Sequence, residues 1–349
     1  MELSHQKRLQ KRRIGGAYLF SISFVLVSFF IGISIGSVHI PLIDTVKIVT
    51  KIGFVSTDEL QQFSSLLWSI RIPRVILTLM IGAALALAGS ALQGLLQNPL
   101  ADPYTLGVSS GASLGAVIVL FFNLQIPFLG MFTLPFMSFV TALLSLLFIL
   151  FFAHVILKRM TTESMILIGV ITSAFLGALI SLVIALSGDE LRQIVNWLLG
   201  SVSMRGWSYV NIFLPFFIVG TILLLLCSKE LNALLFGEEI AQSLGIKVGA
   251  YKVIILIASS ILTGGAVAVS GTIGFVGLIV PHATRFLIGS DHRHLLPLAM
   301  LNGGAFLVIA DLLSRVLIEP RELPIGVITS IIGGPVFAIL LLKKYRQQV

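Results

Sequence analysis

The sequence predicts an all-α polytopic membrane protein with about ten transmembrane helices. Of its 349 residues, 57% are hydrophobic and 11% are charged, whereas a soluble domain carries about 25% charged residues. The apolar residues also form long runs, and no ionisable side chain occurs from Val75 to Leu96. About 20 apolar residues are enough to cross a hydrocarbon core. This composition and this run length favour a bilayer over water.

The apolar runs define the candidate spans in chain order. A basic segment, residues 1–16, precedes the first run and is predicted to be a cytoplasmic tail. The first run is longer than the roughly 7–15 residues of a signal-peptide core, so we expect it to be kept as a helix. The candidate spans are Ala17–Val38, Val75–Leu96, Thr105–Phe122, Leu129–Ile156, Met165–Leu186, Val210–Cys227, Val253–Val269, Ile273–Ile288, Leu295–Leu313 and Ile325–Leu342.

Lysine and arginine between these runs predict the orientation. If both termini are cytoplasmic, 15 of the 23 basic residues fall in cytoplasmic segments. Cytoplasmic loops of membrane proteins carry such an excess, so we expect N-in and C-in. The same distribution accounts for the net charge of +8, and nucleic acid is therefore not expected as a partner.

One segment between spans, residues 228–251, is too polar to cross the membrane. Its sequence predicts two short helices that are broken at Gly237 and end at Gly245. Glu238 and Glu239 would occupy the first turn of the second helix, where carboxylates offset the positive end of the helix dipole. The apolar residues are Leu231, Leu234 and Leu235 in the first helix and Ile240 and Leu244 in the second. Two interpretations stay open: a hairpin on the membrane surface, or a docking element for a cytoplasmic partner.

Several motifs limit the chemistry. The chain contains no Gly-Lys dipeptide, so it has no Walker A loop and ATP-driven work would need another subunit. The stretch 107–111 matches the G-x-S-x-G pattern of a serine nucleophile, which requires a strand before the serine and a helix after it. An intramembrane serine protease using Ser109 with His154 or His282 is therefore one alternative. The lone Cys227 and the His292-Arg293-His294 run do not make a metal site, and no cofactor is expected.

Charged residues near the predicted outer surface carry two further hypotheses. Asp311 and Arg315 are four residues apart and can pair on one helix face. An ionisable residue at membrane depth suggests function, so an ion-coupled secondary transporter using Asp311 is a second alternative; a structural salt bridge is the other interpretation. Arg71 and Arg74 precede the second span, where arginine can bind a carboxylate with two hydrogen bonds or simply anchor the helix at the interface.

Five ordered stretches resemble the iron-chelate, siderophore and cobalamin permeases of type II ABC importers (the FecCD type). The stretches are RIPR at 71–74, GAALALAGSALQGLLQNPLADPYTLGVSSGASLG at 82–115, LNALLFGEEIAQSLGI at 231–246, SGTIGFVGLIVPHATRFLIGSDHRHLLP at 270–297 and ELPIGVITSIIGGPVFAILLLKK at 322–344. With their spacing they cover nearly the whole chain after residue 65.

The resemblance implies one transmembrane permease domain over residues 1–349, multi-pass in the bacterial cytoplasmic membrane and without catalysis of its own. The implied partners are a cytoplasmic ABC ATPase dimer, a second permease subunit (identical or paralogous), and an extracytoplasmic substrate-binding protein. An iron–siderophore is the favoured substrate class, with hydroxamate, catecholate, citrate, haem and cobalamin chelates all open.

The resemblance also assigns roles to residues. Binding-protein docking falls to Arg71, Arg74 and Arg315, with Arg321 nearby. ATPase coupling falls to the segment 228–251, through Leu231, Leu234, Leu235, Gly237, Glu238, Glu239, Ala241, Leu244 and Gly245. A wide pathway for a large chelate should be lined by small, weakly polar residues rather than by charged rings. The candidates are Ser109, Ser110, Ser113, Thr172 and Ser173.

Overall fold

The computed structural model describes residues 2–36, 40–50, 58–156 and 161–346. Over these ranges the chain forms helices joined by turns, with no strand. The α-helices are α1 (Glu2–Ser34), α2 (Leu42–Thr50), α3 (Asp58–Leu66), α4 (Ile72–Leu95), α5 (Val108–Phe121), α6 (Thr133–Phe151), α7 (Thr162–Leu186), α8 (Leu191–Leu198), α9 (Trp207–Leu226), α10 (Ser228–Leu234), α11 (Glu238–Ser243), α12 (Val248–Ser270), α13 (Val276–Ile288), α14 (His292–Val316) and α15 (Ile325–Arg346). Short π-helices, η1 (Leu67–Arg71) and η3 (Phe152–Ile156), precede α4 and follow α6.

Each predicted span coincides with an apolar helix. Seven helices of the described chain are long and apolar enough to cross a membrane, and three shorter apolar helices lie at Val108–Phe121, Val276–Ile288 and Ile325–Ile339. The prediction of a polytopic all-helical protein is therefore confirmed. That all of these helices cross the membrane, and in which direction, stays a prediction.

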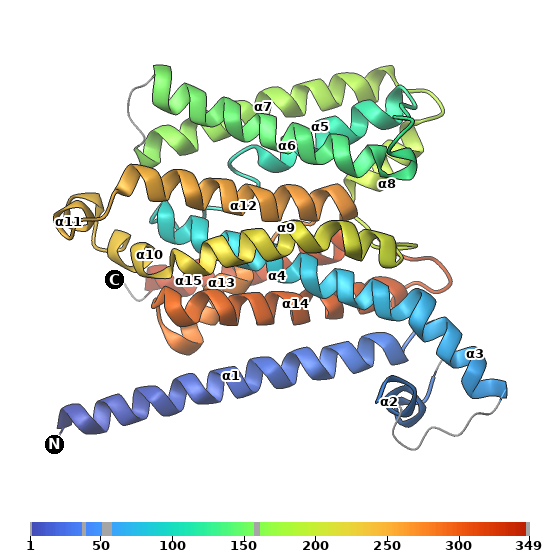
Figure 1. Ribbon diagram of the computed structural model, residues 1–349, viewed down its shortest axis with the longest axis horizontal. Helices are drawn as coiled ribbons and strands as arrows, with labels where there is room; N and C mark the ends of the chain where they lie inside the picture. The colour runs from blue at the N-terminus through green and yellow to red at the C-terminus, as the bar shows by residue number, and fades with distance from the viewer. Residues whose placement is uncertain (1, 37–39, 51–57, 157–160, 347–349) are drawn as a thin grey trace.

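The long helices run side by side, and their short connections gather at two opposite ends of the bundle (Figure 1). At one end lie α10 and α11, with the start of α1 and the end of α15; we refer to it as the α10–α11 end. At the other end lie α2, α3 and α8, and we refer to it as the α2–α3 end. The first and last helices thus begin and finish at the same end, as an even number of crossings requires.

Helix α4 forms the centre of the bundle, and nearly all of its residues are buried. It packs against α14, α12, α13 and α9. A Cβ atom on Gly82 would collide with the backbone of Gly303 in α14, and one on Gly89 with that of Gly277 in α13. Because lipid supplies no hydrophobic force between helices, small residues that let backbones approach are the expected means of association. These glycines therefore let α4 approach α14 and α13 closely.

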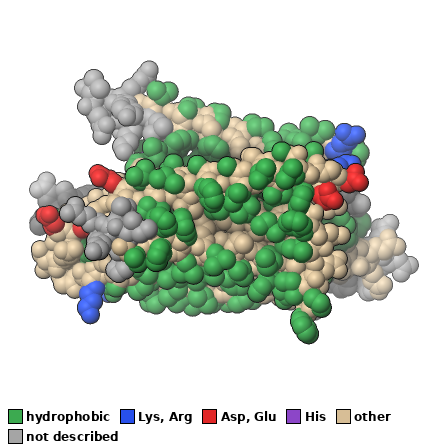
Figure 2. Space-filling model, turned by 90° about the horizontal axis from the view of Figure 1, so that it is seen from above, with side chains coloured by type: hydrophobic (Ala, Val, Ile, Leu, Met, Phe, Trp, Pro, Cys, Tyr) green, Lys and Arg blue, Asp and Glu red, His purple; other side chains and the backbone are tan. Residues whose placement is uncertain are grey.

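The outside of the bundle is apolar. Only 17% of the most hydrophobic part of α7 and 28% of that of α9 are buried. Figure 2 shows hydrophobic side chains across the middle of one face, with the visible charged side chains towards the two ends. An apolar belt between polar ends suits a surface that faces lipid.

Three short helices at the α2–α3 end were not predicted, namely α2, α3 and α8. They are too short to be detected as spans. Helix α2 buries Ile48, and α8 buries Ile194 and Trp197. One placement also needs correction. Arg71 and Arg74 do not precede the second helix as exposed residues; η1 joins α3 to α4 as one helical stretch, and both arginines are buried within it.

Candidate functional site

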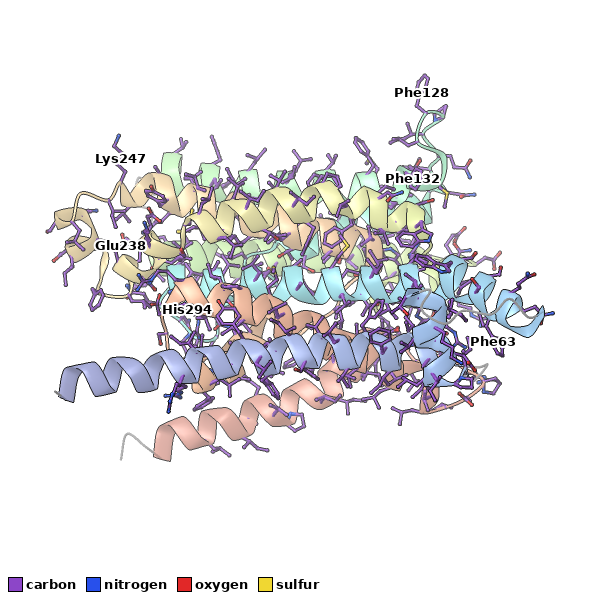
Figure 3. The ribbon with its side chains drawn as sticks, turned by 60° about the horizontal axis from the view of Figure 1, so that its bottom comes forward. Phe63, Phe128, Phe132, Glu238, Lys247 and His294 are labelled. Atoms are coloured by element: carbon purple, nitrogen blue, oxygen red, sulfur yellow. The ribbon has the colours of Figure 1, made fainter. Side chains whose placement is uncertain are left out.

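The predicted site residues fall into three separate places. The arginines lie at the α2–α3 end, the segment 228–251 lies at the α10–α11 end, and the small polar residues lie between these ends. Figure 3 shows Glu238 and Lys247 at one end of the bundle and Phe63 at the opposite end.

Arg71 and Arg315 hold the last turn of α1. The Arg71 Nη1 donates to the carbonyl oxygens of Ile33 and Ser34, at 2.9 and 2.8 Å. Arg315 donates to the carbonyl oxygens of Gly32 and Ile35, each at 3.0 Å. The final carbonyls of a helix have no partner within it, and positive charge is favourable at that end of the dipole. Two of the three arginines predicted for docking therefore hold the end of α1 in this structure.

Arg74 joins two carboxylates. Its Nε and Nη2 donate to Asp311 at 3.1 and 2.9 Å, and its Nη1 and Nη2 donate to Glu322 at 2.8 and 3.1 Å. Arg315 Nε lies 3.2 Å from the second Asp311 oxygen. Asp311 is fully buried between two guanidinium groups, so its charge is compensated and its side chain has no exposed surface. This geometry favours the structural salt bridge over the ion-relay interpretation.

All three arginines line one cavity of about 440 Å³ at the α2–α3 end. The loop after α14 completes its wall with Glu319, Pro320 and Glu322. The structure therefore brings together the residues predicted for docking, although Arg71 and Arg315 are 244 positions apart along the chain. Arg321 is not among the residues that line this cavity.

The segment 228–251 forms the two predicted short helices, α10 and α11. Gly237, with φ of +104°, separates them, and Gly245, with φ of +84°, ends the second. Glu238 and Glu239 occupy the first turn of α11. Glu238 also accepts a hydrogen bond at 2.6 Å from the buried Lys252 of α12, which ties the segment to the bundle.

The structure divides the predicted coupling residues into two sets. Leu231, Leu234 and Ala241 are buried against the bundle, so they hold the segment in place and cannot contact a partner. The exposed apolar residues, which we call the apolar ridge, are Leu235, Phe236, Ile240 and Leu244, with Phe236 at 70% and Ile240 at 52% exposure. Phe236 was not predicted, because helical periodicity does not assign a residue that follows the end of α10.

Asn232 connects α10 to the start of α14. Its Nδ2 donates to Asp291 Oδ1 at 2.7 Å, and its Oδ1 accepts from the backbone N–H of His292 at 2.7 Å and lies 2.9 Å from His292 Nδ1. Hydrogen bonds from Arg293 hold the pKa of Asp291 well below its ordinary value, so this carboxylate is ionised. The side chain of Gln97, just after α4, also donates to the Leu234 carbonyl.

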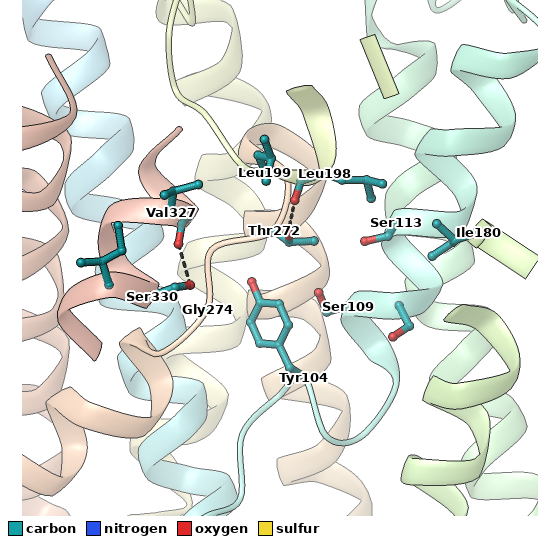
Figure 4. Close-up of a pocket in the computed structure, with 13 residues that line it drawn as sticks. Tyr104, Ser109, Ser113, Ile180, Leu198, Leu199, Thr272, Gly274, Val327 and Ser330 are labelled. Atoms are coloured by element: carbon teal, nitrogen blue, oxygen red, sulfur yellow. Dashed lines mark hydrogen bonds between the residues drawn. The ribbon is translucent and has the colours of Figure 1, made fainter. Parts of the chain in front are cut away.

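A cavity of about 490 Å³ lies between the two ends (Figure 4). Ser109, Ser110 and Ser113 line it, as predicted, together with residues that were not predicted. Those additional polar residues are Tyr104, Thr272 and Ser330. Thr172 and Ser173 are not part of the lining; they pack beneath Gly107, the residue before α5. All three additional residues lie within the stretches that carry the family resemblance, which could have suggested them.

Residues 24–343 match the family model for the FecCD transport family. The chain belongs to this family. It is 56% identical to the uncharacterized ABC transporter permease protein YvrB of Bacillus subtilis (strain 168), over 97% of this chain and 96% of that protein. It is 42% identical to the hemin transport system permease protein HmuU of Yersinia pestis, over 80% of this chain and 84% of that protein.

A solved structure described as an inward-facing conformation of a metal-chelate type ABC transporter has the same fold as this FecCD chain. The TM-score is 0.82 at 31% sequence identity, and the match covers 95% of this chain and 99% of the other. The family resemblance stated from the sequence is thus confirmed, and the FecCD chain is an ABC transporter permease of the importer type.

The FecCD structure does not support the serine-protease alternative. Ser109 is the second residue of α5 and follows a turn closed by Gly107 at φ of +76°. A nucleophile elbow requires a strand at that place. His282 lies on α13, and the His154 side chain lies outside the described residues.

Proposed function

We propose that this FecCD permease forms, with a second permease subunit, the transmembrane pathway of an ABC importer for an iron–siderophore chelate. The observation that carries the proposal is the placement of two contact surfaces at opposite ends of one bundle. The apolar ridge occupies the α10–α11 end, and the arginine-lined cavity occupies the α2–α3 end. The cavity between them is lined by apolar residues and hydroxyl groups, with no charged residue among the described residues of its lining.

The α10–α11 end is the proposed contact with a cytoplasmic ATPase dimer. The chain has no Walker A loop of its own, so energy must come through a partner. Short helices that present exposed apolar side chains are suited to a groove in another protein. Leu235, Phe236, Ile240 and Leu244 would enter that groove, while the buried Leu231 and Leu234 keep the helix in place.

The α2–α3 end is the proposed contact with an extracytoplasmic substrate-binding protein. Arg71, Arg74 and Arg315 line the cavity there, and arginine binds carboxylates with well-defined geometry. Acidic side chains on the binding protein would therefore be recognised at this cavity. This assignment places the α10–α11 end in the cytoplasm, in agreement with the orientation expected from the basic residues.

The chelate would pass beside the central cavity. Its described polar lining consists of hydroxyl groups from Tyr104, Thr272, Ser330 and the three α5 serines. Hydroxyl groups make weak contacts that a bulky chelate can leave again, unlike a ring of charges. Relatives of the chain are named for hemin, cobalamin and molybdate. A siderophore chelate is a large metal-containing molecule, as hemin and cobalamin are.

The proposed cycle couples the two ends through the bundle. ATP binding would close the ATPase dimer and move α10 and α11. Asn232 would transmit this movement to α14 through Asp291 and His292. Because α14 packs along α4, the central helices would shift together and open the pathway alternately to each side.

The first experiment is copurification from native membranes in mild detergent, with mass spectrometry of the proteins recovered with the tagged chain. We expect an ABC ATPase and, with chemical crosslinking, a binding protein. Recovery of the permease without an ATPase would contradict the importer assignment.

Uptake assays in cells lacking the chain then test the substrate. We expect loss of uptake of a radiolabelled ferric siderophore, restored by the intact gene. Loss of cobalamin or hemin uptake instead would disprove the siderophore assignment but remain consistent with an ABC importer. Uptake that stops with a protonophore and continues without the ATPase would support ion coupling.

A further inference from the structure

We propose that Glu322 is an internal substitute for the acidic side chain of the docking protein. The Glu322 carboxylate pairs with Arg74 while no binding protein is bound to the permease. A carboxylate of the incoming binding protein displaces it. This inference rests on the docking role proposed above for the α2–α3 end, and it adds a ligand-exchange step and a route by which docking reaches the pathway.

Arg74 holds one permanent and one replaceable carboxylate. The side chain of Asp311 is 0% exposed, whereas that of Glu322 is 40% exposed. Removing a buried partner such as Asp311 leaves an uncompensated charge and is strongly unfavourable. Exchange of the half-exposed Glu322 for another carboxylate keeps the same number of charge-assisted hydrogen bonds on Arg74. Glu322 is therefore the carboxylate that can leave.

The Arg74–Glu322 pair forms part of the wall between two cavities. The cavity of about 440 Å³ lies on one side, and a second cavity of about 340 Å³ lies on the other. Ile70, Arg74 and Glu322 line both. An acidic side chain that enters either cavity can thus reach the Arg74 guanidinium. Breaking the pair would also join the two cavities into one larger site.

Arg315 does not offer such an exchange, because its carboxylate partner is the buried Asp311. It also donates to carbonyl oxygens of α1, as Arg71 does. Arg74, in contrast, holds Glu322, whose side chain is 40% exposed. Hydrogen bonds from Arg74 outweigh the effect of burial and keep the pKa of Glu322 below its ordinary value, so Glu322 is an anion that matches the group replacing it.

Displacement of Glu322 would affect the pathway by loosening the start of α15. Leu323 N–H donates to the Ser314 carbonyl at 2.9 Å, and Ile325 N–H donates to the Gly200 carbonyl at 3.0 Å. Helix α15 begins at Ile325, and its residues Val327 and Ser330 line the central cavity. The Glu322 side chain is thus three residues from a helix that forms the pathway wall. Its release frees one of the contacts that hold this helix in place.

The test uses the complete importer, with permease, ATPase and binding protein, reconstituted in lipid nanodiscs. Glu322→Gln removes the competing charge and keeps the size of the side chain. We expect the binding protein to bind about fivefold more tightly, which is the upper range for loss of a partly exposed ion pair. We also expect ATPase activity without binding protein to rise, and its stimulation by binding protein to fall.

Glu319→Gln is the matched control. Glu319 lines the same cavity and carries the same charge, but no ion pair to it is found in the described chain. Because the Glu319 charge would act on an incoming carboxylate without occupying Arg74, we expect a much smaller gain in affinity than for Glu322→Gln. An equal effect of both variants would contradict the exchange and indicate general electrostatic attraction. If Glu322→Gln does not assemble, Glu322→Asp keeps the charge but shortens the side chain, and an intermediate gain in affinity is expected.

Arg74→Lys separates this inference from the docking proposal itself. Lysine retains the charge facing Asp311 but lacks the planar fork that binds a carboxylate with two hydrogen bonds. Weaker docking of Arg74→Lys together with no effect of Glu322→Gln would support the docking site but contradict the exchange of Glu322. Normal docking in both variants would overturn the docking site.

Discussion

At the scale of single residues, the buried charges around Asp311 have several partners each. Asp311 accepts hydrogen bonds from Arg74 and forms an ion pair with Arg315. The same arginines reach Glu322 and the end of α1. A buried ion pair contributes little net stability compared with an apolar pair, but removal of one partner is costly. The network therefore sets how α1, α4 and α14 meet at the α2–α3 end.

Asp311→Asn should destabilise the permease by about 3–5 kcal/mol, because two guanidinium groups lose a buried counter-charge. The measurement is thermal unfolding in detergent, monitored as the loss of monodisperse protein in size-exclusion chromatography. Asp189→Asn, at an exposed position, is the control and should leave the transition unchanged. A stable Asp311→Asn variant that loses proton-dependent uptake would revive the ion-relay alternative.

At the scale of elements, the segment 228–251 combines an inner and an outer face in two very short helices. Leu231, Leu234 and Ala241 bury the inner face. Asn232 and Glu238 then attach the segment to α14 and α12 by hydrogen bonds. The segment is therefore attached to two long helices of the bundle, as the proposed coupling requires.

Phe236→Asp together with Ile240→Asp should prevent attachment of the ATPase and leave the permease folded, because both side chains are exposed. The measurement is copurification of the ATPase with the tagged permease. The control is Ile43→Asp, which places the same charge on an exposed apolar residue of α2 at the opposite end. Full ATPase recovery with the double variant would show that the apolar ridge is not the contact.

Asn232→Ala should separate ATPase attachment from transport, because it removes the hydrogen bonds to Asp291 and His292 without changing the exposed ridge. We expect ATP hydrolysis to continue while uptake falls at least tenfold, equivalent to about 1.4 kcal/mol of lost coupling. Ser243→Ala is the control and should transport normally, because the Ser243 hydroxyl donates to the Glu239 carbonyl within α11. A proportional fall in hydrolysis and uptake would indicate lost attachment instead.

At the scale of the whole molecule, the two proposed contact surfaces lie at opposite ends of the bundle, with the central cavity between them. The central cavity is bounded by α5, α8 and α15 and by the turns at Tyr104 and Thr272. Many residues of α7 and α15 are exposed, including Ile331 beside the cavity. A second permease subunit against this side would enclose the pathway, as proposed for the importer.

Ser330→Trp should block the proposed pathway by placing an indole at an exposed position of its wall. We expect uptake of the ferric chelate to be lost while the ATPase and the binding protein still attach. Ile339→Trp, on the same helix but outside the cavity lining, is the control. Normal uptake by Ser330→Trp would mean that the chelate passes elsewhere.

The sequence by itself determined the features that depend on local composition. Long apolar runs located every long helix, Gly237 and Gly245 marked the limits of α11, and the ordered motifs identified the family. Tertiary structure decided which side chains meet and which face outward. Arg74 pairs with residues 237 and 248 positions away, and Leu234 is buried while Phe236 is exposed. A run of apolar residues defines a helix without reference to the rest of the chain, whereas the burial and partners of a side chain depend on how each helix is rotated against its neighbours.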